Sequence, residues 1–131
     1  MYQAEQARIE RAGGTVKRVV LDFELKKKVF AKLNRGNDRS HADHAERKSE
    51  IAEEHGLKVI EGRIVFPDLR IEYERADQEM DKVDLELATG DYKNGQMRAK
   101  HAAGLKIYAP DSAVGSPALQ DPEIIAGLIS I

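Results

Sequence analysis

Cysteine and tryptophan are absent from the 131-residue sequence, and aromatic residues make up only 5% of it. Without cysteine the chain can form neither disulfide bonds nor cysteine-based zinc sites, and it has no thiol nucleophile. So few aromatic rings argue against a stacking platform for single-stranded nucleic acids. No apolar run approaches the roughly 18 residues of a membrane-spanning helix. The polar residues 1–10 do not resemble a secretory signal, so we expect a cytoplasmic protein without a membrane partner.

Charge is plentiful and unevenly distributed. Residues 17–35 carry seven basic and two acidic side chains, whereas residues 66–91 carry three basic and nine acidic ones. Basic segments attract phosphates and clustered carboxylates attract divalent cations. The basic segment therefore predicts contacts to the DNA backbone without sequence readout. Those contacts would come from Lys26, Lys27, Lys28, Lys32 and Arg35. The alternative is that both segments are solvated faces with unrelated charge.

Turn residues and hydrophobic periodicity divide the chain into helices and strands. Helices are expected over 4–11, 23–34, 39–54, 94–103 and 123–128, and strands over 15–21, 57–60, 64–74, 82–89 and 105–109. From residue 39 onward, this order predicts an antiparallel three-stranded meander, a crossover helix and a parallel fourth strand. The sequence thus predicts a single globular α/β domain with a mixed four-stranded sheet flanked by helices. Within it, residues 1–38 form an N-terminal helical arm and a basic helix, and residues 39–131 form the core with the C-terminal helix.

Two acidic residues stand out on the predicted strands. Pro67 interrupts strand 64–74, and because proline cannot donate to a sheet it marks a bulge or edge that re-aims Asp68. Apolar and acidic residues alternate along 82–89, so Glu86 faces away from the apolar side. If these strands pair, the two carboxylates converge into a possible divalent-metal site for phosphodiester hydrolysis. The alternative is an antiparallel sheet with one solvated face.

At these residues the sequence resembles the PD-(D/E)xK, restriction-endonuclease-like superfamily. That resemblance implies an αβββαβ core, with an aspartate on the second core strand and an acid-x-Lys on the third. It also implies Mg²⁺ or Mn²⁺ as cofactor. Pro67-Asp68 matches the first motif and Glu86 the acid of the second. More narrowly, the chain resembles the replication-relaxation family of plasmid and mobile-element proteins. The matching stretches are Phe66-Pro67-Asp68, Asp84-Leu85-Glu86-Leu87, Lys100 and Ile107-Tyr108.

The sequence departs from this pattern at the lysine. The position two residues after Glu86 is Ala88, which can neither orient a water molecule nor hold a metal. The resemblance implies that Lys100, on the following helix, replaces it; the alternative is an ordinary solvent-facing lysine. Metal ligands would then be Asp68 and Glu86, with further candidates on the preceding helix at Glu50, Glu53 and Glu54. His41 and His44 are weaker candidates for a separate metal site, with a polar helix face as the alternative.

These features leave three functions open. The first is a Mg²⁺-dependent nuclease acting on DNA through Asp68, Glu86 and Lys100. The second is a catalytically inactive DNA-binding module of the same fold. The third is a protein-interaction module, in which Phe23, Phe30 and the apolar C-terminal residues dock a second copy or another domain. The resemblance also implies a winged-helix domain or a replication or mobilisation protein as partner.

Overall fold

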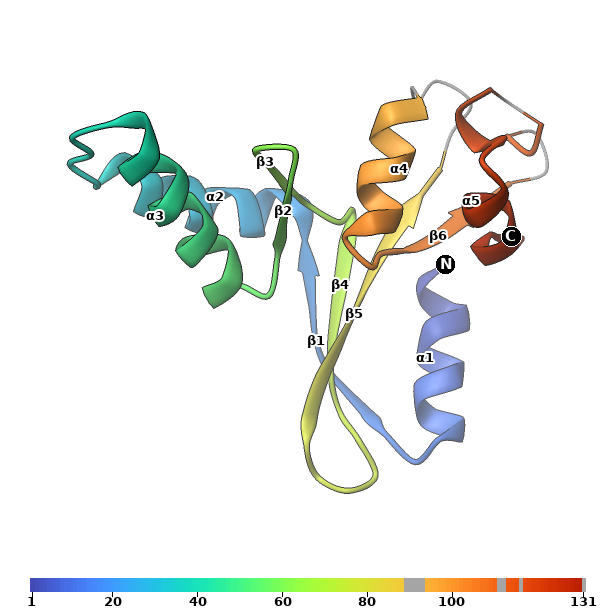
Figure 1. Ribbon diagram of the computed structural model, residues 1–131. Coiled ribbons are helices and arrows are strands. Elements are labelled where there is room, and N and C mark those ends of the chain that lie inside the picture. Colours follow the sequence, from blue (N-terminus) through green and yellow to red (C-terminus); the bar gives the residue numbers. More distant parts are fainter. Residues whose placement is uncertain (89–93, 111–112, 116, 131) are drawn as a thin grey trace.

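The computed structural model describes residues 1–88, 94–110, 113–115 and 117–130 (Figure 1). Its helices are α1 (Tyr2–Arg11), α2 (Asp22–Asn34), α3 (His41–Glu54), α4 (Asn94–Ala102), the 3₁₀ turn η1 (Pro117–Leu119) and α5 (Pro122–Gly127). Its strands are β1 (Thr15–Leu21), β2 (Lys58–Ile60), β3 (Arg63–Val65), β4 (Leu69–Glu74), β5 (Met80–Leu87), β6 (Lys106–Ala109) and β7 (Ile129–Ser130). None of the helices in these ranges is long and apolar enough to cross a membrane.

The main sheet has five strands in the order β1-β4-β5-β6-β7. β1, β4 and β5 are antiparallel neighbours, whereas β5, β6 and β7 run parallel, so the sheet is mixed and flanked by helices. The predicted four-stranded sheet is therefore wrong in its strand count. β1, which the sequence analysis placed in the N-terminal part, pairs with β4 along its length and forms one edge of the sheet. The predicted parallel pair around the crossover helix α4 is confirmed.

The expected strand 64–74 is in fact two strands in two different sheets. β3 pairs with β2 in a separate two-stranded hairpin, and β4 begins at Leu69 in the main sheet. The break falls at Pro67, which has no N–H for a ladder hydrogen bond and is buried at the change of sheet. The predicted three-stranded meander is therefore wrong, because the chain changes sheets at the proline.

The two faces of the main sheet are covered differently. On one face Ile9 of α1 packs against Ile71, Leu85 and Tyr108 from three neighbouring strands. On the other face, α2 and α3 cover the β1 end while α4 and α5 cover the β6 end. Figure 1 shows the β2–β3 hairpin standing between these two pairs of helices. Glu86 belongs to this second face, because it pairs in register with the buried Ile107.

Local signals explain where α3 begins and ends. Its predicted start at residue 39 is slightly early, because the Ser40 side chain caps the helix by accepting a hydrogen bond from the Asp43 N–H at 3.1 Å. At the other end Gly56 adopts a positive φ of 66°. The N–H groups of Gly56 and Leu57 return to the carbonyls of Glu53 and Ala52, which is the Schellman arrangement that glycine favours. The hairpin then starts directly after this stop.

α2 begins one residue earlier than expected. Asp22 is its first residue and forms an ion pair with Lys26 at 3.2 Å. An acidic side chain in the first turn also interacts favourably with the helix dipole. Since Asp22 follows the last residue of β1 directly, the start of α2 is fixed to the edge of the sheet.

A buried carboxylate attaches α1 to the sheet. Glu5 is only 1% exposed and accepts hydrogen bonds from Lys106 Nζ and Tyr108 Oη, both at 2.7 Å, and from Arg8 Nε at 2.8 Å. Burial opposes ionisation of Glu5, but these hydrogen bonds outweigh it and hold the pKa of its carboxyl below the ordinary value. Burial, together with the Glu5 carboxylate, raises the pKa of Tyr108. At neutral pH the network therefore joins an ionised Glu5 to a neutral phenol.

Candidate functional site

Asp68 lies in the segment that connects the hairpin to the main sheet, immediately before β4. Its backbone N–H donates to the carbonyl of Leu85 at 3.0 Å, and its Oδ2 accepts from the backbone N–H of Leu87 at 2.9 Å. These two partners flank Glu86 on β5. The Pro67 break therefore leaves Asp68 hydrogen-bonded to the residues on both sides of Glu86 on the neighbouring strand.

Glu86 is fully buried in the middle of the sheet. A buried carboxylate is costly unless it is paired, and Glu86 forms an ion pair with Lys100, whose Nζ lies 3.0 Å from its Oε1. The apolar residues that alternate with Glu86 on β5, Leu85 and Leu87, contribute to the core under α1 on the opposite face. The alternation along residues 82–89 thus predicted the orientation of Glu86 correctly, as far as the structure describes that segment.

Lys100 reaches this carboxylate from α4, and its side chain is only 21% exposed. Its ammonium also donates a hydrogen bond to the backbone carbonyl of Phe66, next to Pro67. Of the two interpretations left open by the sequence, the solvent-facing lysine is wrong. The signal for this lay in the helix itself, because Lys100 follows the fully buried Met97 by three residues and so shares its sheet-facing side.

Ala88, two residues after Glu86, lies inside the apolar core. Ala88 is fully buried in the cluster formed with Met97, Ile107 and Ile124. Its N–H donates to the carbonyl of Tyr108 at 2.7 Å, so the backbone here is held against β6. A lysine at this position would have to place its charge inside that apolar cluster.

Asp68, Glu86 and Lys100 line one cavity of about 1000 Å³. Its walls come from three directions, namely α2, the β2–β3 hairpin and α4. The other lining residues are Asp22, Lys26, Ile60, Glu61, Arg63, Ile64, Val65, Phe66, Gly95, Gln96 and Ala99. We call this cavity the cleft. The sequence did not identify Glu61 and Arg63 of the hairpin as residues of the cleft. The hairpin forms a wall of the cleft only because the chain changes sheets at Pro67.

The other predicted metal ligands lie elsewhere. Glu50, Glu53 and Glu54 of α3 are exposed and do not line the cleft, and Glu54 forms an ion pair with Lys32 at 2.8 Å. The side chain of His44 contacts the Asp38 carboxylate at 2.7 Å. Among the residues that the structure describes, no group of three or more His, Asp and Glu side chains is arranged to hold a metal ion.

Asp68 and Glu86 nevertheless fit a magnesium or manganese site. Mg²⁺ prefers hard oxygen ligands and is usually held by one or two carboxylates, with waters and substrate phosphates completing its shell. The two carboxylates supply such a donor set on one wall of a cavity large enough for a phosphodiester. The donor chemistry of these two residues is therefore compatible with Mg²⁺ or Mn²⁺.

The predicted basic helix does not present its charges as one surface. Lys26 lines the cleft and lies 5.8 Å from the centre of the Phe66 ring, whereas Lys32 is paired with Glu54 on α3. Lys28 borders a different cavity, next to His55 and Arg70. Lys27 and Arg35 are exposed. Of the five predicted DNA-binding residues, Lys26 is the one placed on the cleft wall.

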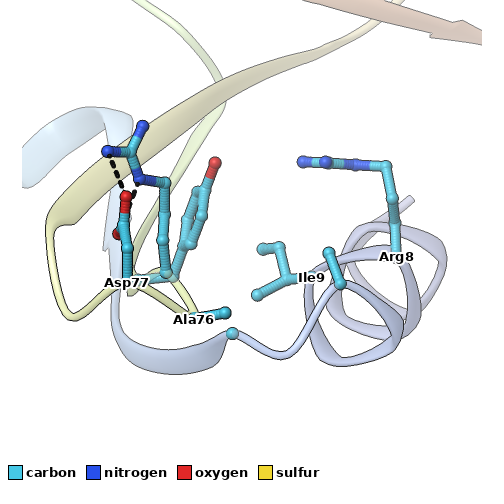
Figure 2. A pocket seen from close by; sticks show the side chains of 8 residues that line it. Arg8, Ile9, Ala76 and Asp77 are labelled. Atoms are coloured by element: carbon cyan, nitrogen blue, oxygen red, sulfur yellow. Dashed lines mark hydrogen bonds and ion pairs between the residues drawn. The ribbon is translucent and has the colours of Figure 1, made fainter.

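A second cavity, of about 400 Å³, lies between α1 and the loop that joins β4 to β5 (Figure 2). Arg8 and Arg75 stand on its two sides, but Arg8 is paired with Glu5 at 2.8 Å and Arg75 with Asp77 at 3.0 Å. This cavity lies at the end of β4 remote from Asp68 and is lined by no residue of the cleft. It therefore has no part in the chemistry of Asp68 and Glu86.

Tyr108, part of the family resemblance, is placed away from the cleft. Its ring packs on the α1 face with Ile9, and its hydroxyl donates to the buried Glu5. The tyrosine therefore stabilises the docking of α1 and does not face Glu86.

No family model, curated protein or solved structure matches this chain.

Proposed function

We propose that this protein is a nuclease that hydrolyses phosphodiester bonds in DNA with the help of Mg²⁺ or Mn²⁺. One observation carries the proposal: the Lys100 ammonium lies 3.0 Å from the buried Glu86 carboxylate, while Asp68 is bonded to the residues on both sides of Glu86. Two carboxylates and an ammonium in one cleft are the groups that metal-assisted phosphodiester hydrolysis needs.

The arrangement of strands supports a restriction-endonuclease-like core for this function. β4 and β5 are the second and third strands in the order of the main sheet; Glu86 lies on β5, and Asp68 immediately precedes β4, close to the two positions at which the resemblance expects acidic motifs. α4 then leads to β6, which runs parallel to β5. In this proposal Lys100 on α4 replaces the lysine that the acid-x-Lys motif would have at position 88, because Ala88 is enclosed in the apolar core.

Asp68, Glu86 and Lys100 each have a defined part in the proposed reaction. Asp68 and Glu86 would hold the cation, which polarises the scissile phosphate when bound. Lys100 is oriented by Glu86 and the Phe66 carbonyl, and its ammonium donates to the attacking water or to a phosphate oxygen. In the overall reaction the hydroxyl of water joins the phosphorus, the bond to the sugar oxygen breaks, and that oxygen takes the remaining proton.

The source of the DNA follows from the family resemblance. The residues that resemble the replication-relaxation family suggest plasmid or other mobile-element DNA as substrate. They also suggest a winged-helix domain or a replication protein as partner. A module of the same fold that binds without cleaving is the competing function, and the replacement of the strand lysine by Ala88 is the observation that favours it.

Incubation with supercoiled plasmid and with branched DNA tests the proposal. We expect the wild-type protein to nick or linearise DNA in Mg²⁺ and to stop when EDTA is added. Asp68→Asn keeps the size of the side chain but weakens its charge-dependent hold on the cation, so cleavage should be lost. Asp77→Asn, in the exposed β4–β5 loop, is the matched control and should cleave like the wild type. Cleavage that persists in Asp68→Asn, or no cleavage by the wild type, would contradict the proposal.

A further inference from the structure

The three phenylalanines of the chain gather at α2 and the cleft. Phe23 is 61% exposed and Phe30 46% exposed, although both are large apolar side chains. They are seven residues apart on α2, which places them on the same side of the helix about 10 Å apart. The Phe30 ring lies 5.6 Å from the ring of Phe66, which lines the cleft. Phe30 therefore connects the exposed aromatic side of α2 to Phe66, a buried ring in the wall of the cleft.

Two lysines lie between these rings. Lys26 and Lys27 are both exposed and fall within one helical turn of Phe23 or Phe30. Lys26 also lines the cleft and lies over the Phe66 ring at 5.8 Å from its centre. One side of α2 thus carries two aromatic rings and two ammonium groups, of which Lys26 lines the cleft and is paired with Asp22 at 3.2 Å. We call Phe23, Lys26, Lys27 and Phe30 the aromatic–basic stripe.

This combination points to one kind of ligand. Exposed rings stack on nucleobases, and lysines beside them neutralise the phosphates that connect those bases. A duplex hides the faces of its bases, so only unpaired nucleotides can use such rings. A protein partner fits less well, because covering the stripe would bury two lysine charges, and lysine is depleted from the core of protein interfaces.

We propose that the aromatic–basic stripe of α2 binds unpaired nucleotides of a DNA strand and leads that strand into the cleft. That the bound strand is then cleaved in the cleft rests on the proposed function. The substrate class is DNA with a single-stranded segment, such as a flap, gap or branch. Phe23 and Phe30 stack on bases, while Lys26 and Lys27 contact the intervening phosphates. The few aromatic residues of the sequence are thus sufficient for stacking because they are concentrated in one place.

Equilibrium binding tests this inference without any cleavage. Fluorescence anisotropy with a labelled single-stranded oligonucleotide, and with the corresponding duplex, is measured in EDTA. We expect tighter binding of the single strand by the wild type, and about tenfold or greater weakening of that binding in Phe23→Ala/Phe30→Ala. Binding of the duplex should change little. Phe23→Leu/Phe30→Leu retains apolar surface without rings, so it should weaken single-strand binding nearly as much.

Controls and alternative outcomes separate this inference from others. Met80→Ala removes an equally exposed apolar side chain, 58% accessible on β5, and should bind like the wild type. Wild-type protein that does not prefer the single strand, or alanine variants that bind it normally, would overturn the inference. So would sedimentation showing that the phenylalanines hold two copies together while DNA binding is unaffected. Because no metal is present, a failure of the cleavage assay would leave this result unaffected, and the two proposals can fail separately.

Discussion

Replacing Lys100 with methionine is expected to lower the rate constant of DNA cleavage by about 10²–10⁴-fold, the usual contribution of a positioned proton donor or acceptor. The ammonium is held 3.0 Å from Glu86 and bonded to the Phe66 carbonyl, so it already points into the cleft before DNA arrives. Methionine keeps an unbranched flexible stem but supplies no donor. Because Asp68 and Glu86 remain, binding of Mn²⁺ should persist.

Single-turnover cleavage of plasmid DNA measures this loss directly. Lys58→Met, at an exposed position on β2, is the control and should keep the wild-type rate. Lys100→Arg retains the positive charge in a larger planar group, so its rate should remain well below that of the wild type. A wild-type rate in Lys100→Met would show that the lysine only neutralises Glu86, and it would remove Lys100 from the proposed reaction.

Arg70→Met is expected to have the largest effect on stability, lowering the free energy of unfolding by about 3 kcal/mol. Arg70 and Asp84 are 5% and 7% exposed and form a two-pronged ion pair at 2.7 and 3.0 Å. Arg70 also donates to the backbone carbonyls of His55 and Gly56 at the end of α3. This decrease in the free energy of unfolding is at the lower end of the range expected when one partner of a buried ion pair is removed, because Lys82 Nζ still lies 3.0 Å from the Asp84 carboxylate.

Urea unfolding followed by circular dichroism checks this prediction. Arg11→Met, at an exposed position on α1, should change the free energy of unfolding by no more than about 0.5 kcal/mol. Arg70→Met/Asp84→Leu should be more stable than Arg70→Met alone, since it no longer leaves an under-compensated buried carboxylate. If Arg70→Met is as stable as the Arg11 variant, the pair does not fix α3 to the sheet.

This ion pair also has a consequence for the cleft. Arg70 on β4 holds the last residues before the β2–β3 hairpin, and that hairpin forms one wall of the cleft. The acidic face of β5 is thus used in two ways: Asp84 fixes the hairpin through Arg70, while Glu86 lines the cleft. Both residues alternate with apolar neighbours on β5, so the sequence predicted their shared face but not their different partners.

Much of the candidate site was predictable because it depends on short-range rules. The two-residue period of β5 predicted which face Glu86 occupies, and the missing N–H of Pro67 predicted an irregularity at Asp68. Helix ends at Ser40 and Gly56 follow from capping chemistry in the same way. These features involve residues close in sequence, or two strands joined by one turn.

The remaining features depend on contacts between distant parts of the chain. β1 ends at Leu21 and pairs with β4, which begins only at Leu69. Nothing in the sequence pattern of β1 shows whether it forms an edge of the main sheet or part of a separate arm. The change of sheet at Pro67 decides that the hairpin becomes a wall rather than part of a meander. The contact of Lys100 with Phe66 and Glu86 depends on how α4 crosses the sheet, which local spacing only suggests.

The central claim is that Asp68 and Glu86 form a divalent-cation site, and calorimetric titration with Mn²⁺ tests it most directly. We expect the wild type to bind Mn²⁺ and Glu86→Gln to lose that binding. Glu61→Gln removes another carboxylate charge from the same cleft and is the matched control, so it should bind like the wild type. Equal binding by the wild type and Glu86→Gln, or no binding by the wild type, would contradict the account.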